Sequence, residues 1–193
     1  MTEKFDPSSL PKFPDLAFEL KLWKNGLTRL GGVDEAGRGA WAGPVSAGMV
    51  ILPADISILK TLHGVRDSKQ MSALQREHWV ELIQENCLAW GVGFASAVEI
   101  DEIGILPATR LAVSRALQNL SVSPDLLITD YLKLPEISIP QIALVKGDCR
   151  SLSVASASIL AKIGRDGLMR QLAVDFPEYG FARHKGYGTR QHQ

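Results

Sequence analysis

Cysteine is scarce in this chain of 193 residues: only Cys87 and Cys149 occur, and they do not form a CxxC pair. That scarcity excludes a small protein stapled by disulfides and favours reduced thiols in a cytoplasmic setting. Cys149 follows an acidic residue, but a soft thiol suits zinc rather than a hard cation. We therefore interpret both cysteines as structural.

The chain also lacks net charge, a long apolar run and low-complexity tracts. Lys and Arg number 21, as do Asp and Glu. This balance argues against a uniformly basic nucleic-acid coat protein, yet it leaves nucleic-acid enzymes open because net charge averages over faces that differ. The uncharged run 40–54 is too short to span a bilayer, and the first fifteen residues, MTEKFDPSSLPKFPD, do not resemble a signal peptide. A globular protein with no membrane partner is expected.

The pattern of apolar segments and turn signals predicts an α/β fold, with a mixed sheet covered by helices. Pro7, Pro11 and Pro14 keep the start extended, so residues 1–30 are expected to be an N-terminal extension, and 31–193 the main domain. Ser72 and Gln75 form a capping-box pattern at the start of one helix. The expected strands are 31–35, 45–52, 87–98, 126–130 and 139–145, and the expected helices are 15–24, 73–86, 109–120 and 151–175.

Four acidic residues follow apolar segments at expected strand ends: Asp34, Glu35, Asp130 and Asp148. A buried carboxylate is costly unless it is paired or bound to a metal, and Mg²⁺ prefers such oxygen ligands. Neighbouring strand residues point to opposite faces, so Asp34 and Glu35 are expected to share a site only if the strand ends or bulges there. Each acid taken alone also fits a turn or cap residue. Asp166 is interpreted as an ordinary surface or helix acid, with a structural ion pair between Arg165 and Asp166 as the alternative.

A glycine-rich turn, Gly37-Arg38-Gly39, follows the acid pair directly. Glycine allows backbone N–H groups to approach a phosphate or sugar, and the planar fork of Arg38 suits a phosphate. The segment is neither a P-loop nor a dinucleotide fingerprint. Taken alone such a segment is more often a simple turn, and its position directly after Asp34 and Glu35 favours a functional role.

Charge is distributed unevenly along the chain. Residues 70–128 contain three basic and seven acidic residues, whereas residues 144–190 contain eight basic and four acidic residues. The last segment, YGFARHKGYGTRQHQ, interleaves aromatic rings with cations, a pattern that offers stacking surfaces and phosphate contacts to nucleic acid. A solvated helix surface explains the basic excess equally well.

Together these segments resemble the type 2 ribonucleases H, and specifically bacterial ribonuclease HII. The resemblance covers nearly everything from residue 31 onward. The matching segments are GGVDEAGRGAWAGPVSAGMVIL (31–52), DSKQMSALQRE (67–77), LLITD (126–130), KGDCRSLSVASASILAKIGRD (146–166) and YGFARHKGYGTRQH (179–192).

The resemblance implies an RNase H-like fold, with a mixed five-stranded sheet flanked by helices. It also implies catalytic, metal-binding roles for Asp34, Glu35, Asp130 and Asp148, which would hold two Mg²⁺ or Mn²⁺ ions. Substrate-binding roles are implied for Gly37, Arg38 and Gly39, which resemble the family's reader of the ribonucleotide 2′-hydroxyl. Tyr187 is similar to the family's junction-sensing tyrosine, which stacks on the deoxyribose that follows the ribonucleotide.

The implied reaction is hydrolysis of the phosphodiester on the 5′ side of a ribonucleotide, leaving 3′-hydroxyl and 5′-phosphate ends. The implied partners are RNA–DNA hybrids and duplex DNA with embedded single ribonucleotides, so the implied role is removal of misincorporated ribonucleotides by a monomer.

The chain departs from the family pattern at two places. Tyr131 stands after the third acid, where the family usually has glycine. The chain also stops at Gln193, whereas family members usually continue into a further helical piece, so we expect 31–193 to lack that piece and its grip on substrate. Two alternatives remain: a nucleic-acid binding module without turnover, and a junction resolvase. The intact acids argue against the first, and the Gly-Arg-Gly turn and KGYGT tail against the second.

Overall fold

The computed structural model describes residues 5, 6, 8 and 10–192. The expected extended start at Pro7 and the remaining terminal positions 1–4, 9 and 193 lie outside the described residues. None of the helices in the described ranges combines the length and the apolar character that crossing a bilayer requires.

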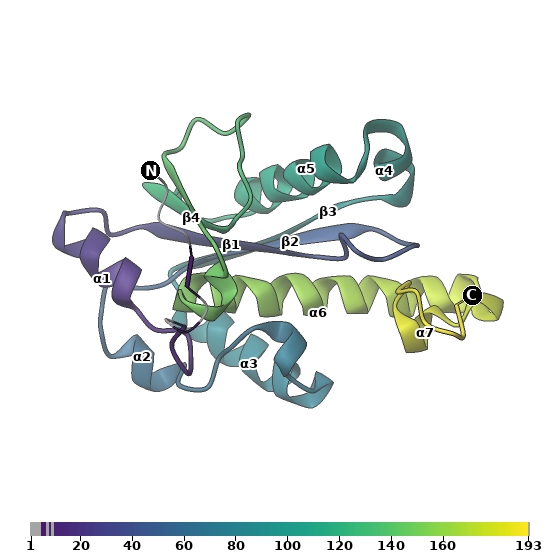
Figure 1. Cartoon of the computed structure of the whole chain (residues 1–193), viewed down its shortest axis with the longest axis horizontal. Helices are drawn as coiled ribbons and strands as arrows, with labels where there is room; N and C mark the ends of the chain where they lie inside the picture. Colours follow the sequence, from purple (N-terminus) through teal and green to yellow (C-terminus); the bar gives the residue numbers. More distant parts are fainter. Residues whose placement is uncertain (1–4, 7, 9, 193) are drawn as a thin grey trace.

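Five strands form one sheet at the centre of the molecule (Figure 1). Their order is β3-β2-β1-β4-β5, with β1 antiparallel to β2 and parallel to β4. The strands are β1 (Leu30–Ala36), β2 (Val45–Ile51), β3 (Ala89–Ala95), β4 (Leu126–Asp130) and β5 (Gln141–Leu144). This mixed five-stranded sheet confirms the α/β fold expected from the sequence.

Helices cover both faces of the sheet (Figure 1). The long helix α6 packs along β1 and β2 on one face, and α5 packs on β2 and β3 on the other. Two apolar clusters, one on each side, hold these layers together. The helices are α1 (Ala17–Lys24), α2 (Ile58–Thr61), α3 (Ala73–Asn86), α4 (Ala97–Ile103), α5 (Ile105–Gln118), α6 (Leu152–Asp175) and α7 (Phe181–His184), with short 3₁₀ turns η2 (Ser68–Gln70), η3 (Gly147–Cys149) and η4 (Pro177–Tyr179).

Local capping explains where several helices start. Ser72 accepts from the N–H of Gln75, and the Gln75 side chain returns to the N–H of Ser72, so the expected capping box of α3 is confirmed. A second capping box, between Ser96 and Glu99, starts α4. The expected strand 87–98 was therefore too long, because its last residues begin this helix.

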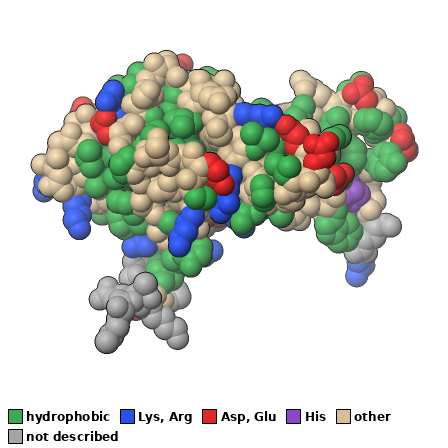
Figure 2. Space-filling model, turned by 90° about the horizontal axis from the view of Figure 1, so that it is seen from above, with side chains coloured by type: hydrophobic (Ala, Val, Ile, Leu, Met, Phe, Trp, Pro, Cys, Tyr) green, Lys and Arg blue, Asp and Glu red, His purple; other side chains and the backbone are tan. Residues whose placement is uncertain are grey.

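Helix α5 begins four residues before the expected position 109. Gly104, at φ 84°, separates α4 from α5, and Pro107 lies in the first turn of α5. Proline is tolerated there because the N–H that it lacks would have no partner within the helix. The acidic side chains Glu99, Asp101 and Glu102 belong to the α4 end of the molecule, where Figure 2 shows red side chains gathered.

The described part of residues 1–30 is attached to the domain through the start of α6. The N–H of Leu152 donates to the carbonyl of Asp15, and Leu16 is fully buried. Ser151 caps α6 by accepting from the N–H of Val154. Glu19 is also fully buried and accepts from the hydroxyl groups of Ser151 and Ser153. The carboxylate of α1 thus meets the positive end of the long helix.

Candidate active site

The four candidate acids follow three strands that lie side by side and run parallel. Asp34 and Glu35 lie near the end of β1, Asp130 ends β4, and Asp148 lies in η3, just after β5. The N–H of Gly147 donates to Asp130 Oδ1 at 2.8 Å, which ties η3 to the end of β4. Because parallel strands end at the same edge of a sheet, all four acids gather there.

A strand end or bulge at Asp34 and Glu35, the condition set for a shared site, is absent from β1. The strand continues to Ala36 in unbroken register, with Asp34 opposite Gly48 and Glu35 opposite Ala47. The two side chains therefore leave the strand on opposite faces. They still interact, because the charge of Glu35 affects the pKa of Asp34.

Burial and like charge both act on these carboxyl groups. Burial raises the pKa of Asp34 well above its ordinary value, and the charges of Glu35 and Asp130 raise it further. Burial and then the charge of Asp148 raise the pKa of Asp130 to about 6, although the N–H of Gly147 opposes this. Ionised together, the acids repel one another, and a cation placed among them relieves that repulsion.

Two carboxylate oxygens of this edge are buried without a hydrogen-bond partner among the described residues: Glu35 Oε2 and Asp148 Oδ1. Buried polar atoms are nearly always paired, and oxygens without a partner within the chain are able to ligate a cation. In the same described ranges, no three His, Cys, Asp or Glu side chains form a ready-made metal cage. An open set of acids still fits Mg²⁺ or Mn²⁺, because such ions are held by one or two carboxylates plus waters and substrate phosphate.

A groove of about 680 Å³ opens beside the acids. It brings together five of the residues selected from the sequence, namely Glu35, Gly37, Arg38, Gly39 and Tyr187. The other three acids do not line it. The remaining lining residues are Ala36, Ser68, Lys69, Ile105 and Lys162.

The two lysines of the groove were not selected from the sequence. Burial lowers the pKa of Lys69, but the charges of Asp67, Asp34 and the other strand-end acids outweigh it and raise the pKa. Lys162 lies 5.1 Å from the centre of the Tyr187 ring. The signal for Lys162 was a single cation directly after the apolar run SILA in the buried half of α6.

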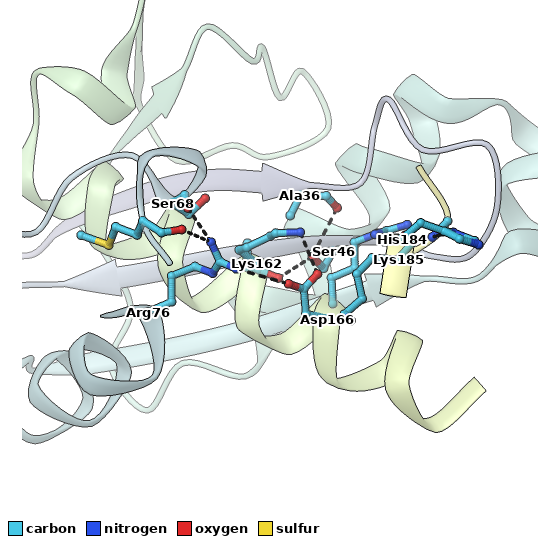
Figure 3. Close-up of polar contacts among 12 residues, drawn as sticks. Ala36, Ser46, Ser68, Arg76, Lys162, Asp166, His184 and Lys185 are labelled. Atoms are coloured by element: carbon cyan, nitrogen blue, oxygen red, sulfur yellow. Dashed lines mark hydrogen bonds and ion pairs between the residues drawn. The ribbon is translucent and has the colours of Figure 1, made fainter. Parts of the chain in front are cut away.

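Asp166 lies in α6, as expected of a helix acid, but it is not a surface acid, because it is only 5% exposed. It pairs with Lys162 Nζ at 2.7 Å and with Arg76 Nη2 at 3.8 Å, rather than with its neighbour in the chain (Figure 3). Arg76 also donates to the carbonyls of Ser68 and Met71. Asp166 thereby holds Lys162 in place and, through Arg76, the turn that carries Lys69.

The two glycines of the Gly-Arg-Gly turn differ physically. Gly37 has φ 105°, and a Cβ there would lie 2.2 Å from Arg165 Nε, so the fold itself requires glycine. A Cβ at Gly39 would meet nothing within 4 Å. Between them, Arg38 Nη1 donates to Glu35 Oε1 at 2.9 Å.

Tyr131 adopts a left-handed conformation, with φ 56°, directly after Asp130. This backbone conformation suits glycine better than a residue with a side chain. The side chain is 72% exposed, so the ring extends into solvent instead of packing over the acids.

The comparisons with known proteins point to one family. The family model described as ribonuclease HII matches residues 31–193. A ribonuclease HII from Chloroflexus aurantiacus is 54% identical over 181 residues, which are 93% of this chain and 85% of the relative. A ribonuclease HII from Desulfitobacterium hafniense is 48% identical over 174 residues, which are 90% of this chain and 65% of the relative.

The fold is similar to that of solved structures as well. The crystal structure of the ribonuclease H2 from Pyrococcus horikoshii OT3 superimposes with a TM-score of 0.67 at 29% sequence identity. The match covers 84% of this chain and 82% of that chain. The sheet that positions the strand-end acids, with its flanking helices, thus belongs to a known architecture.

Proposed function

The chain belongs to the ribonuclease HII family, and on that premise we propose that it hydrolyses the phosphodiester on the 5′ side of a ribonucleotide. The substrates are RNA–DNA hybrids and duplex DNA with embedded single ribonucleotides, and the products carry 3′-hydroxyl and 5′-phosphate ends. The observation that carries the proposal is the edge where four mutually repelling acids meet a groove lined by Arg38, Lys69 and Lys162.

Asp34, Glu35, Asp130 and Asp148 are the residues that would hold two Mg²⁺ or Mn²⁺ ions. Bound there, the ions would supply a water activated at neutral pH and positive charge for the leaving oxygen. Support comes from the unpartnered buried oxygens of Glu35 and Asp148 and from the raised pKa values of Asp34 and Asp130.

The other residues that line the groove bind the substrate. Lys69, Lys162 and Arg38 bind phosphates of the substrate backbone. The open space above Gly39 lets a sugar approach the backbone, so that its 2′-hydroxyl is read by the turn. The Tyr187 ring stacks on the sugar that follows the ribonucleotide.

The proposal includes a cellular role and an effect of bound cations on the charge of the acid edge. The enzyme acts as a cytoplasmic monomer in the removal of ribonucleotides from DNA. Uptake of cations by the acid cluster makes this edge of a neutral chain more attractive to polyanions than its sequence charge indicates.

A cleavage assay on a duplex with one embedded ribonucleotide tests the proposal. We expect a single cut on the 5′ side of the ribonucleotide with Mg²⁺ or Mn²⁺, none with EDTA, and none in the all-DNA duplex of the same sequence. Extension of the upstream fragment by a DNA polymerase checks for the 3′-hydroxyl end. Binding of the duplex with no cut under any metal condition would contradict the proposal and favour a binding module instead.

A further inference from the structure

Arg165 is among the largest side chains that the described structure buries completely, at 0% exposure. It lies on α6, directly before Asp166. Its guanidinium donates to three carbonyl oxygens: Nε to Pro44 at 2.7 Å, Nη1 to Lys185 at 2.7 Å and Nη2 to Ala42 at 3.1 Å. No acidic side chain forms an ion pair with it within the described residues.

These carbonyls belong to two segments that are far apart in the chain. Ala42 and Pro44 follow the Gly-Arg-Gly turn, whereas Lys185 precedes Tyr187. The segments also bond to each other, because the N–H of Trp41 donates to the carbonyl of Gly186 at 2.8 Å. We call this set of contacts the turn–tail joint, formed by residues 41–44 and 185–186.

The same guanidinium touches both proposed recognition elements. Its carbon atom lies 5.2 Å from the centre of the Tyr187 ring. Its Nε occupies the space that a side chain at residue 37 would need. One rigid fork thus contacts the Gly-Arg-Gly turn, the carbonyls of the joint and the face of the tyrosine.

We infer that Arg165 is a positioning residue that fixes Tyr187 relative to the Gly-Arg-Gly turn and so sets the enzyme's discrimination of ribonucleotide from deoxyribonucleotide. This inference rests on the proposed function. A planar fork with several donors matches three converging carbonyls, which a point charge such as lysine does not. Burying a guanidinium is costly, and filling the space would need only an apolar side chain. The geometry of the joint accounts for arginine at this position.

The test compares Arg165→Met and Arg165→Lys with Arg170→Met, which removes an exposed charge from the same helix. Two quantities are measured: cleavage of the single-ribonucleotide duplex, and the ratio of affinities for that duplex and its all-DNA counterpart in EDTA. Arg165→Met should lose about a hundredfold in cleavage, the scale of a misplaced reacting group, and should bring the affinity ratio toward one. Arg165→Lys should show a smaller loss of cleavage and a smaller fall in the affinity ratio. Arg170→Met should weaken both affinities equally and leave the ratio unchanged.

A double-mutant cycle with Tyr187→Ala separates positioning from general stability. If Arg165 acts through the tyrosine, Arg165→Met should add little to the loss that Tyr187→Ala already causes. Additive losses, or an unchanged affinity ratio in a folded Arg165→Met protein, would overturn the inference.

Gly186→Ala covers the case in which Arg165→Met does not fold. A Cβ at residue 186 would lie 2.2 Å from the carbonyl oxygen of Ala42. The substitution therefore pushes the two segments of the turn–tail joint apart while leaving Arg165 in place. It should lower the affinity ratio as Arg165→Lys does, and an unchanged ratio counts against the inference. Wild-type protein that binds both duplexes equally and cuts neither would instead refute the proposed function, which distinguishes the two failures.

Discussion

Two groups of buried acids in this molecule differ in the hydrogen-bond donors and cations that surround them. At the sheet edge, Asp34 and Asp130 have raised pKa values, and oxygens of Glu35 and Asp148 have no partner among the described residues. Around α6, Asp166 pairs with two cations. One oxygen of Glu19 accepts hydrogen bonds from two hydroxyl groups and a backbone N–H, and its other oxygen has no partner among the described residues.

This difference in donors shows which buried carboxyl groups the chain itself stabilises and which it does not. The acids around α6 have donors supplied by the chain itself, so they fix the positions of the η2 turn, Lys162 and α1. The acids at the sheet edge have few such donors and repel one another when ionised, and either a proton or a cation relieves that repulsion. Neutralising an acid at the sheet edge should therefore stabilise the metal-free protein more than neutralising Glu19 does.

The largest expected effect is at Asp34. Asp34→Asn should lower the cleavage rate by at least about a hundredfold, as expected when a group that organises transition-state charge is removed. In EDTA at neutral pH the same variant should melt at a higher temperature than wild type. Burial, and then the charge of Glu35, raise the folded-state pKa of Asp34. The wild-type protein therefore loses folding stability as the pH rises from 3.8, the ordinary pKa of the carboxyl, through the raised value.

The stability gain of Asp34→Asn should shrink as the pH falls from the raised folded-state pKa toward 3.8, the ordinary pKa of the carboxyl, and it should vanish below 3.8, where both states of the wild-type protein are protonated. Thermal unfolding over a pH series checks this. Asp175→Asn, an exposed acid at the end of α6, is the matched control and should change neither quantity. A variant that melts below wild type in EDTA would show that the edge acids are stabilised by contacts within the chain.

The second expected effect separates the two glycines of the Gly-Arg-Gly turn. Gly37→Ala should cost about 2 kcal/mol of unfolding free energy, because the left-handed backbone and Arg165 leave no room for a side chain. Gly39→Ala should leave stability within about 0.5 kcal/mol of wild type, because its Cβ meets nothing within 4 Å.

Gly39→Ala should nevertheless weaken affinity for the ribonucleotide duplex about tenfold, because its methyl group holds the sugar away from the turn. Denaturant unfolding and duplex binding in EDTA measure the two effects. Full affinity in Gly39→Ala would contradict the proposal that the substrate approaches the backbone there.

Much of this arrangement could be predicted from the sequence because it depends on local patterns. Apolar runs gave β1 and β4, and the Ser72–Gln75 pair gave the start of α3. The family resemblance also named five residues that line one groove. The third strand was predicted to run too far, to residue 98, because Ser96 and Glu99 form a capping box that starts α4. This capping box is also a local signal.

The role of Arg165 and the pairing of Asp166 with Arg76 could not be predicted, because these partners are distant in the chain. The pair of Asp166 with Lys162, by contrast, has a local i,i+4 spacing. Ala42 and Lys185 are brought to Arg165 only by the folding of the turn and the tail onto α6. Arg76 likewise meets Asp166 only when α3 packs on α6. Sequence spacing shows which residues are consecutive, and these contacts depend on tertiary packing instead.

The smallest expected effect is at Glu19, the acid that meets the start of α6. Burial raises its folded-state pKa despite hydrogen bonds from Ser151 and Ser153. The folded protein therefore binds this proton more tightly than the unfolded chain, and the stability that the protonated carboxyl contributes should be lost as the pH rises above 4.5, its ordinary pKa. Glu19→Gln should reduce this pH dependence and leave the protein more stable than wild type at neutral pH.

The expected gain for Glu19→Gln is about 1 kcal/mol or less, because the neutral amide gives up charge-assisted hydrogen bonds that partly offset the burial. Glu19→Ala is the matched contrast: it leaves the hydroxyl groups of Ser151 and Ser153 without this acceptor and should be destabilised across the pH range. Denaturant unfolding of the three proteins at several pH values measures the effect. If Glu19→Gln is less stable than wild type at neutral pH, the ionised carboxylate stabilises the positive end of α6 by more than its burial costs, and the contrast with the sheet edge widens.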